Sequence, residues 1–373
     1  MQKAILALSS LFRHGAGLQA DQLKLSALNA LVKSAGMGIT SENAVQHVVA
    51  GIILCLFEVA NSKSHVLPLP PEKTPQKTYT DVVGCPQISH NAESARQWMW
   101  YITGAKEVIA NAPGAYWAEE NGLHALFDWA YYYEVLARFS ALHWRPQSKV
   151  ETPHSPPNQV SALRADTIDQ KMTTCDAFPA RNRALILLSE VCKAVLPSSD
   201  PMSRTKAYRE RIAALKQEVE YGGAFGPPLS RTVPGLHPNM TTRGEIMAQL
   251  HQIAMLIYLS RATDDRAQTA GRLEYFIDRG MATLTALSHC DRPFPILILG
   301  FEARDDGERT AVLDLIARTR RNPYPKHRLE CVRNFLQGVW NQMDLHAEDG
   351  VGIDYLETLT AVVSTSEIMP PLV

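Results

Sequence analysis

The sequence predicts an all-α fold, a single large domain built from packed helix pairs. Apolar residues recur at spacings of three and four along most of the chain, which places them on one face of an α-helix. No segment shows the clear alternation of apolar and polar residues that is typical of a β-strand. The chain has 373 residues, of which 46% are hydrophobic, so it can bury a substantial core.

The predicted helices follow one another along the chain with this spacing. The clearest extends from about Glu245 to Arg261, where Leu250, Ile253 and Ile257 share one face. The same pattern predicts helices over residues Leu23–Val32, Ala44–Val59, Ala95–Ile109, Leu123–Leu142, Arg181–Val195, Gly271–Leu287, Asp306–Ala317 and His327–Met343.

Proline-rich stretches separate these helices and predict loops, because proline ends helices. They are residues Pro68–Pro75, Pro146–Pro157 and Gly222–Pro238. We therefore predict one domain over residues 1–373, with a possible break in a loop near residues 146–157.

Charge and cysteine usage narrow the function classes. The net charge of -1 provides no overall field to attract nucleic acid, an anionic membrane or acidic ligands. Six cysteines without a CxxC pair indicate a reducing compartment, the cytoplasm or nucleus. The longest apolar run, Val48–Phe57, covers roughly half of the ~20 residues that span a bilayer, so no membrane span is expected.

Several segments, in a fixed order, carry a likeness to a known family. The strongest lie in the C-terminal third: FPILILGFEARDDGERTAVLDLIART (Phe294–Thr319), VRNFLQGVW (Val332–Trp340) and the final MPPLV. The others are AILALSSLFR (Ala4–Arg13), GIILCLFEVANS (Gly51–Ser62), WMWYITGAKEVI (Trp98–Ile109), LFDWAYYYEVLARFS (Leu126–Ser140) and IAMLIYLSRA (Ile253–Ala262). Together they resemble the fungal-specific transcription factor domain that follows the zinc cluster in many fungal regulators.

This resemblance implies a helical regulatory domain that controls RNA polymerase II transcription in the nucleus, with secondary metabolism as a field of action. The partners it implies are other transcription factor subunits or co-regulators, an apolar small-molecule effector and a second copy in a homodimer. It implies no catalytic residue. The family usually has W-x-x-H-x-x-G-A where this chain has Tyr101 at the histidine position, so no role of that histidine is transferred.

The zinc cluster that gives such regulators their DNA binding is absent from this sequence. It needs six thiolates within a few dozen residues, whereas neighbouring cysteines here are 17 to 98 residues apart. A basic linker and coiled-coil heptads are also not apparent. We therefore expect no zinc or other cofactor and no direct DNA binding by this chain, which is either part of a longer factor or a stand-alone relative.

Two acidic doublets support a rival hypothesis, a terpene cyclase-like enzyme in which Mg²⁺ holds an isoprenoid diphosphate. Its ligands would be Asp264, Asp265, Asp305 and Asp306. The first doublet lacks the third acid of a DDxxD pattern, and acids at a helix start are favoured by capping alone. The main hypothesis therefore assigns no metal ligand.

Other chemistry-bearing residues have structural explanations beside functional ones. An aromatic stretch could line a ligand pocket, although rings at helical spacing more often form a core: Trp129, Tyr131, Tyr132, Tyr133, Phe139 and Trp144. The histidines show no metal-binding spacing and are predicted to be cap or surface residues, among them His124, His143, His251, His289 and His346.

Neither the cysteines nor the basic runs give strong evidence of a function. Cys290 follows His289 directly, and Cys175 precedes Asp176; neighbours on a helix point to different faces, so neither pair is expected to act as a dyad. The basic runs Arg204–Arg211 and Arg318–Arg328 could serve nuclear import or phosphate contact, but interspersed glutamates favour a solvated helix face.

Overall fold

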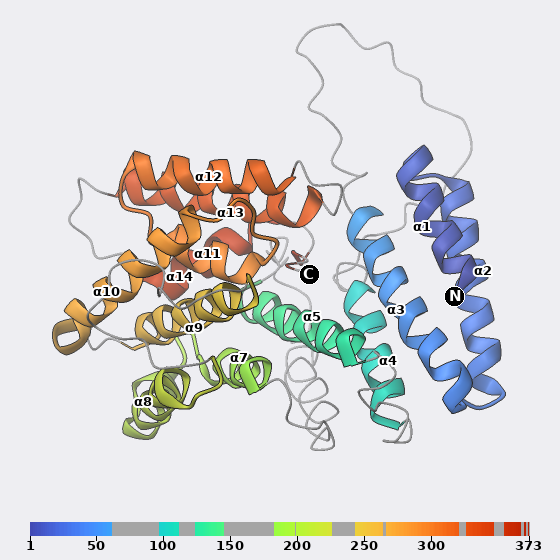
Figure 1. Cartoon of the computed structure of the whole chain (residues 1–373), viewed down its shortest axis with the longest axis horizontal. Coiled ribbons are helices and arrows are strands. Elements are labelled where there is room, and N and C mark those ends of the chain that lie inside the picture. The colour runs from blue at the N-terminus through green and yellow to red at the C-terminus, as the bar shows by residue number, and fades with distance from the viewer. Residues whose placement is uncertain are drawn as a thin grey trace, which may run out of the picture. The chain divides into compact units, whose positions relative to one another are not determined.

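The protein is all α-helical in every part that the computed structural model describes, as predicted (Figure 1). The described residues are 1–61, 97–111, 124–144, 183–197, 199–225, 243–263, 266–320, 326–346, 354–366, 369–370 and 372. They contain thirteen α-helices, one short 3₁₀ helix and no strand.

The chain divides into two compact units, Met1–Ala130 and Tyr131–Val373. The predicted break near residues 146–157 lies outside the described residues, and the single domain stays a prediction. The first unit contains α1 (Gln2–His14), α2 (Leu18–Gly36), α3 (Ser41–Asn61) and α4 (Gln97–Asn111), and α5 (His124–His143) runs on into the second.

The second unit contains the remaining helices, coloured from green to red in Figure 1. They are α7 (Arg183–Ala194), the 3₁₀ helix η4 (Pro201–Arg204), α8 (Lys206–Tyr221), α9 (Arg243–Arg261), α10 (Arg266–Thr285), α11 (Pro293–Phe301), α12 (Asp306–Arg320), α13 (Lys326–Leu345) and α14 (Tyr355–Val363).

Small residues form the helix contacts of the first unit. Helix α1 packs against α2 and α3, and α3 packs against α4. Ala4, Ala27 and Ala50 meet Leu54 in one buried cluster, because alanine lets helix backbones approach closely. A Cβ atom at Gly51 would lie 3.2 Å from the backbone oxygen of Tyr101, so α3 and α4 are also closely spaced.

Helix α3 is the most apolar helix of the first unit. Its segment Asn43–Asn61 is long and apolar enough to cross a membrane by length and composition. Half of that segment is buried inside the protein, and the core helix of a soluble protein meets the same criteria. The expectation that the chain has no membrane span therefore stays a prediction.

Two helices form the centre of the second unit. Helix α9 packs against α7, α8, α10 and α11, and all of its residues from Gln252 to Leu259 are buried. Every residue of α11 is buried, because a helix that is apolar all round must be enclosed. The periodicity argument missed α11 for this reason, since a run without polar positions has no helical period.

Candidate functional site

A cavity of about 370 Å³ lies in the second unit, where the ends of α5 and α7 meet one face of α14. This volume falls within the range of small-molecule sites, roughly 300–1,000 Å³. Its walls are Leu142, His143, Val195, Leu196, Pro197, Ser199, Leu356, Glu357, Thr360, Ala361 and Ser364. Six of these are apolar, and the polar ones can orient a ligand by hydrogen bonds.

His143 connects the cavity wall to the core. Its side chain is only 3% exposed, and its Nε2 lies 2.7 Å from the hydroxyl of Tyr258 on α9. Its Nδ1 lies 3.0 Å from the Thr360 hydroxyl on α14. Each hydroxyl can donate or accept, so the neutral ring is satisfied in either tautomer.

The prediction that His143 is a cap or surface residue was wrong. The two hydroxyls that bind it are 115 and 217 residues away in the sequence, so no local pattern shows them. A buried imidazole needs such partners, because an unpaired polar group costs free energy in the core.

The segment after α14 fastens the cavity wall to the end of α5. The Ser364 hydroxyl donates to the backbone oxygen of His143 at 3.2 Å. The indole nitrogen of Trp144 donates to the backbone oxygen of Ser366 at 2.9 Å. These bonds join α5 to the C-terminal region at the edge of the cavity.

A second cavity of about 450 Å³ lies between α13 and α14. Its walls are Asn334, Gly338, Gln342, His346, Asp354, Glu357, Thr358, Ala361, Val362 and Thr365. Glu357 and Ala361 border both cavities. Helix α14 therefore separates two hollows, and a ligand in either one contacts the same short helix.

The aromatic stretch of α5 forms core and lines neither cavity. The ring of Phe139 packs edge-on against Tyr258 and Phe294, with centroids 5.5 and 5.4 Å away. Tyr132 lies under the guanidinium of Arg292, which is 4.9 Å from the ring centroid. These residues line neither of the two cavities, and the part of α5 that reaches the first cavity is its last turn.

His251 is a second histidine that the surface prediction misplaced. Its half-buried ring sets Nδ1 2.8 Å from the backbone oxygen of Met247, so this nitrogen donates. Nε2 then accepts from the Tyr132 hydroxyl at 3.4 Å. Burial, opposed by the bond to Met247 and helped by the charge of Arg292, lowers the pKa of His251 to about 4. The ring is neutral at physiological pH.

The other three predicted histidines divide as follows. His346 lies at the surface, as predicted, whereas His289 is half-buried. The side chain of His124 lies outside the described residues.

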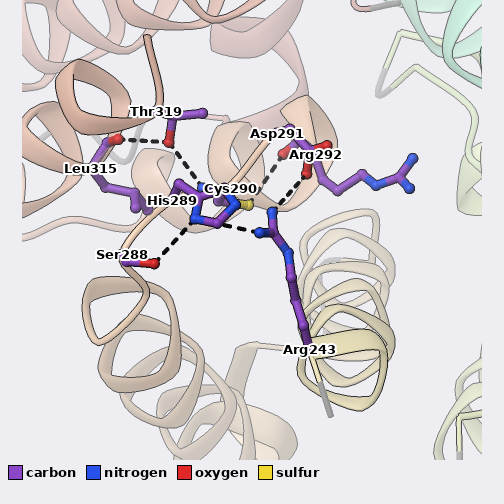
Figure 2. Close-up of polar contacts among 8 residues, drawn as sticks. All are labelled: Arg243, Ser288, His289, Cys290, Asp291, Arg292, Leu315 and Thr319. Carbon is purple, nitrogen blue, oxygen red and sulfur yellow. Dashed lines mark hydrogen bonds and ion pairs between the residues drawn. The ribbon is translucent and has the colours of Figure 1, made fainter. Parts of the chain in front are cut away.

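Cys290 lies in the loop between α10 and α11, and its surroundings do not favour a nucleophile (Figure 2). Its backbone N–H donates to the Thr319 hydroxyl at 2.9 Å, and that hydroxyl donates to the Leu315 oxygen at 2.8 Å. Burial raises the pKa of the Cys290 thiol to about 11, and the sulfur faces the backbone oxygen of Arg292. A thiol with so high a pKa is protonated at neutral pH and inert.

The side chain of His289 contacts Ser288 and Arg243 and not the Cys290 thiol. Its Nδ1 lies 3.1 Å from the Ser288 hydroxyl and 3.4 Å from a guanidinium nitrogen of Arg243 (Figure 2). Arg243 also pairs with Asp291 at 3.4 Å, which attaches the start of α9 to this loop. These bonds agree with the prediction that His289 and Cys290 form no dyad. Cys175 and Asp176 lie outside the described residues.

The second acidic doublet, Asp305 and Asp306, lies at the start of α12, where Asp305 caps the helix. Asp305 Oδ1 accepts from the backbone N–H of Glu308 at 2.8 Å, and the Glu308 carboxylate accepts from the N–H of Arg304 at 2.7 Å. Asp305 is therefore the N-cap of α12, and the Glu308 carboxylate bonds one residue before the N-cap, whereas a capping box would use the N–H of Asp305 itself. Asp306 is fully exposed and lies 3.9 Å from Arg309.

The Mg²⁺ hypothesis gains no support from these positions. Asp264 and Asp265 lie outside the described residues. Within the described part of the chain, no group of three or more His, Cys, Asp or Glu side chains could hold a metal ion.

The first basic run lies on a solvated helix face. Arg204, Arg209 and Arg211 are exposed, and Lys206 forms an exposed pair with Glu210 at 3.4 Å, one turn away. In the second run, residues 321–325 lie outside the described residues, and Arg318 donates to the backbone oxygen of Leu287 at 3.2 Å.

Comparison with known proteins adds two matches. The sequence model of a family described as the fungal specific transcription factor domain matches residues 1–362. The chain is also 29% identical to "Transcription factor iacI" of Pestalotiopsis fici over 374 residues, covering 99% of this chain and 83% of that protein. No solved structure matches.

Proposed function

The chain belongs to the fungal specific transcription factor domain family, and from this we propose that it controls RNA polymerase II transcription in the nucleus in response to an apolar small molecule. It is a fungal transcription regulator. The observation that carries the proposal is the family match over nearly the whole chain together with the cavity beside α14. Genes of secondary metabolism are the targets we propose.

The cavity supports an effector of limited size with one or two polar groups. Leu142, Val195 and Leu356 offer apolar contacts, whereas Thr360 and Ser364 offer hydroxyls. An apolar ligand with a hydroxyl or carbonyl matches this lining, because apolar area supplies affinity and a few polar groups fix orientation. A ligand there would bias the position of α14, which borders both cavities.

The partners that we propose are transcription factor subunits or co-regulators. With a net charge of -1, the chain has no overall attraction for DNA. DNA contact would then come from a zinc-cluster segment elsewhere in the protein or from a partner that carries one.

A tethered reporter tests the regulatory function. The full chain is fused to a bacterial DNA-binding domain in a filamentous fungus whose reporter promoter carries the matching operators. We expect reporter transcription to change severalfold relative to the DNA-binding domain alone. A fluorescent fusion should accumulate in the nucleus. An unchanged reporter together with a cytoplasmic fusion would contradict the proposal.

A cavity-filling variant tests the effector site. Ala361 is exposed and borders both cavities, so Ala361→Phe should fill them without disturbing the core. We expect reporter transcription from this variant to stay at one level and no longer respond to the effector, because the phenylalanine blocks effector binding. Ala214→Phe, at an exposed position of α8, is the matched control and should behave as wild type. Equal responses from both variants would disprove the effector site.

A further inference from the structure

Exposed apolar side chains are frequent in the first two helices and the residues next to them. Nine of the fourteen large apolar side chains that are exposed in the described part of the chain lie within residues 1–39. Large apolar side chains that are exposed close together on a protein surface mark an interaction site.

Helix α2 is apolar on two opposite faces. One face buries Ala20 and Ala27 against its neighbours in the first unit. On the opposite face, Leu18 is 82% exposed, Leu25 58% and Val32 71%. Successive members are seven residues apart, nearly two helical turns, so the three side chains follow one line along the helix.

Polar but uncharged residues complete this line. Gln22 and Asn29 follow Leu18 and Leu25 by four residues, and both are exposed. Alternating steps of four and three are the pattern of a two-helix seam, with the leucines at d positions and the amides at a positions. No charged residue lies on the line, so two copies can approach without repulsion.

We propose that this line, the α2 seam, pairs with the α2 seam of a second copy of this chain, parallel and in register. In that arrangement Leu18, Leu25 and Val32 each meet their own counterpart across a two-fold axis. Gln22 and Asn29 also meet themselves, and a side-chain amide carries both a donor and an acceptor. An antiparallel pair would place leucines opposite amides and leave those amides without partners.

Asn29 also favours a pair of helices over a larger bundle. A single asparagine at an a position fixes register and favours two strands at a cost in stability. The seam is hard to see in the sequence because its a positions are polar, and the exposure of Leu18, Leu25 and Val32 points to it.

The seam is short, and this limits its strength. Helix α2 has 19 residues, about 28 Å in length. Such a contact falls at the small end of specific interfaces. We therefore expect a dimer that dissociates at about micromolar concentrations, and this inference does not depend on the effector cavity.

Sedimentation velocity of the full chain over a concentration series tests the seam. The wild-type chain should shift from monomer to dimer, whereas Leu25→Asp should remain a monomer throughout. Leu345→Asp is the matched control, because Leu345 is a 70% exposed leucine at the end of α13, and it should dimerise as wild type does.

Three outcomes would overturn the proposal. They are a wild-type chain that stays monomeric, equal effects of the two aspartate variants, and a Leu25→Asp monomer that unfolds more readily. The last outcome would mean that residues of the same chain cover the seam.

Disulfide trapping tests the direction of the pair. Asn29→Cys should form a cross-linked dimer on mild oxidation, since position 29 faces itself in a parallel pair. Lys33→Cys, exposed on the same helix but off the seam, is the control and should cross-link far less. Wild type under the same oxidation measures cross-linking through its own six cysteines. Equal yields at both positions would refute the parallel register.

Discussion

At the scale of single residues, His143 joins α5, α9 and α14 through its two ring nitrogens. In His143→Leu the new side chain is of similar size, but the buried Tyr258 hydroxyl loses its hydrogen-bond partner. Such a loss costs about 1–3 kcal/mol of unfolding free energy. Urea unfolding should show this decrease, and His346→Leu, at an exposed position, should stay within about 0.5 kcal/mol of wild type.

His251 makes stability depend on pH. Its pKa is about 4 in the folded protein, below the ordinary value of 6.5, so between these pH values the unfolded chain binds a proton that the folded protein does not. Its contribution is complete above pH 6.5 and is lost as the pH falls toward 4. The slope from this residue reaches at most about 1.4 kcal/mol per pH unit.

The variant His251→Asn isolates this effect. Its unfolding free energy should fall less steeply than that of wild type between pH 6.5 and pH 4, as measured by urea unfolding at several pH values. His346→Asn, at an exposed position, should retain the wild-type slope. A slope that is unchanged in His251→Asn would contradict a ring that is neutral in the folded protein.

At the scale of elements, α10 carries two glycines with opposite roles. A Cβ atom at Gly280 would lie 2.9 Å from Ile253 Cγ2 and still closer to Leu299, so α10 packs tightly on α9 and α11 there. A Cβ atom at Gly271 would meet nothing within 4 Å. Gly280→Ala should therefore destabilise by about 1–3 kcal/mol through overpacking.

The paired control is Gly271→Ala in the same helix. It should stabilise by about 0.5–1 kcal/mol, because alanine restricts the unfolded chain and favours helix. Thermal unfolding of the two variants should thus shift in opposite directions. A stabilised Gly280→Ala would mean that α9, α10 and α11 have room to separate.

At the scale of the whole molecule, the cysteine spacing predicts that zinc plays no part in folding. Two zinc ions need six thiolates within a short segment, and the cysteines here are 17 to 98 residues apart. Prolonged EDTA treatment should leave the unfolding midpoint unchanged, and elemental analysis should find no stoichiometric zinc. A midpoint that falls with EDTA and recovers with zinc would disprove this prediction.

Local sequence patterns were sufficient to predict much of this molecule. The spacing of apolar residues predicted the helices around Leu250 and Ile257, because a helix exposes its period wherever one face is polar. The ordered motifs predicted the family, which the match over residues 1–362 confirmed. The wide cysteine spacing argued against a zinc cluster formed by neighbours in sequence.

Only the tertiary structure decided which groups meet. The cavity gathers Leu142, Val195 and Leu356 from across more than half of the chain, and no local pattern records such distances. His143 looked like any helical histidine until α9 and α14 supplied its partners. Helix α2 has two apolar faces, and periodicity cannot say which one is buried, because burial depends on the neighbours that the fold provides.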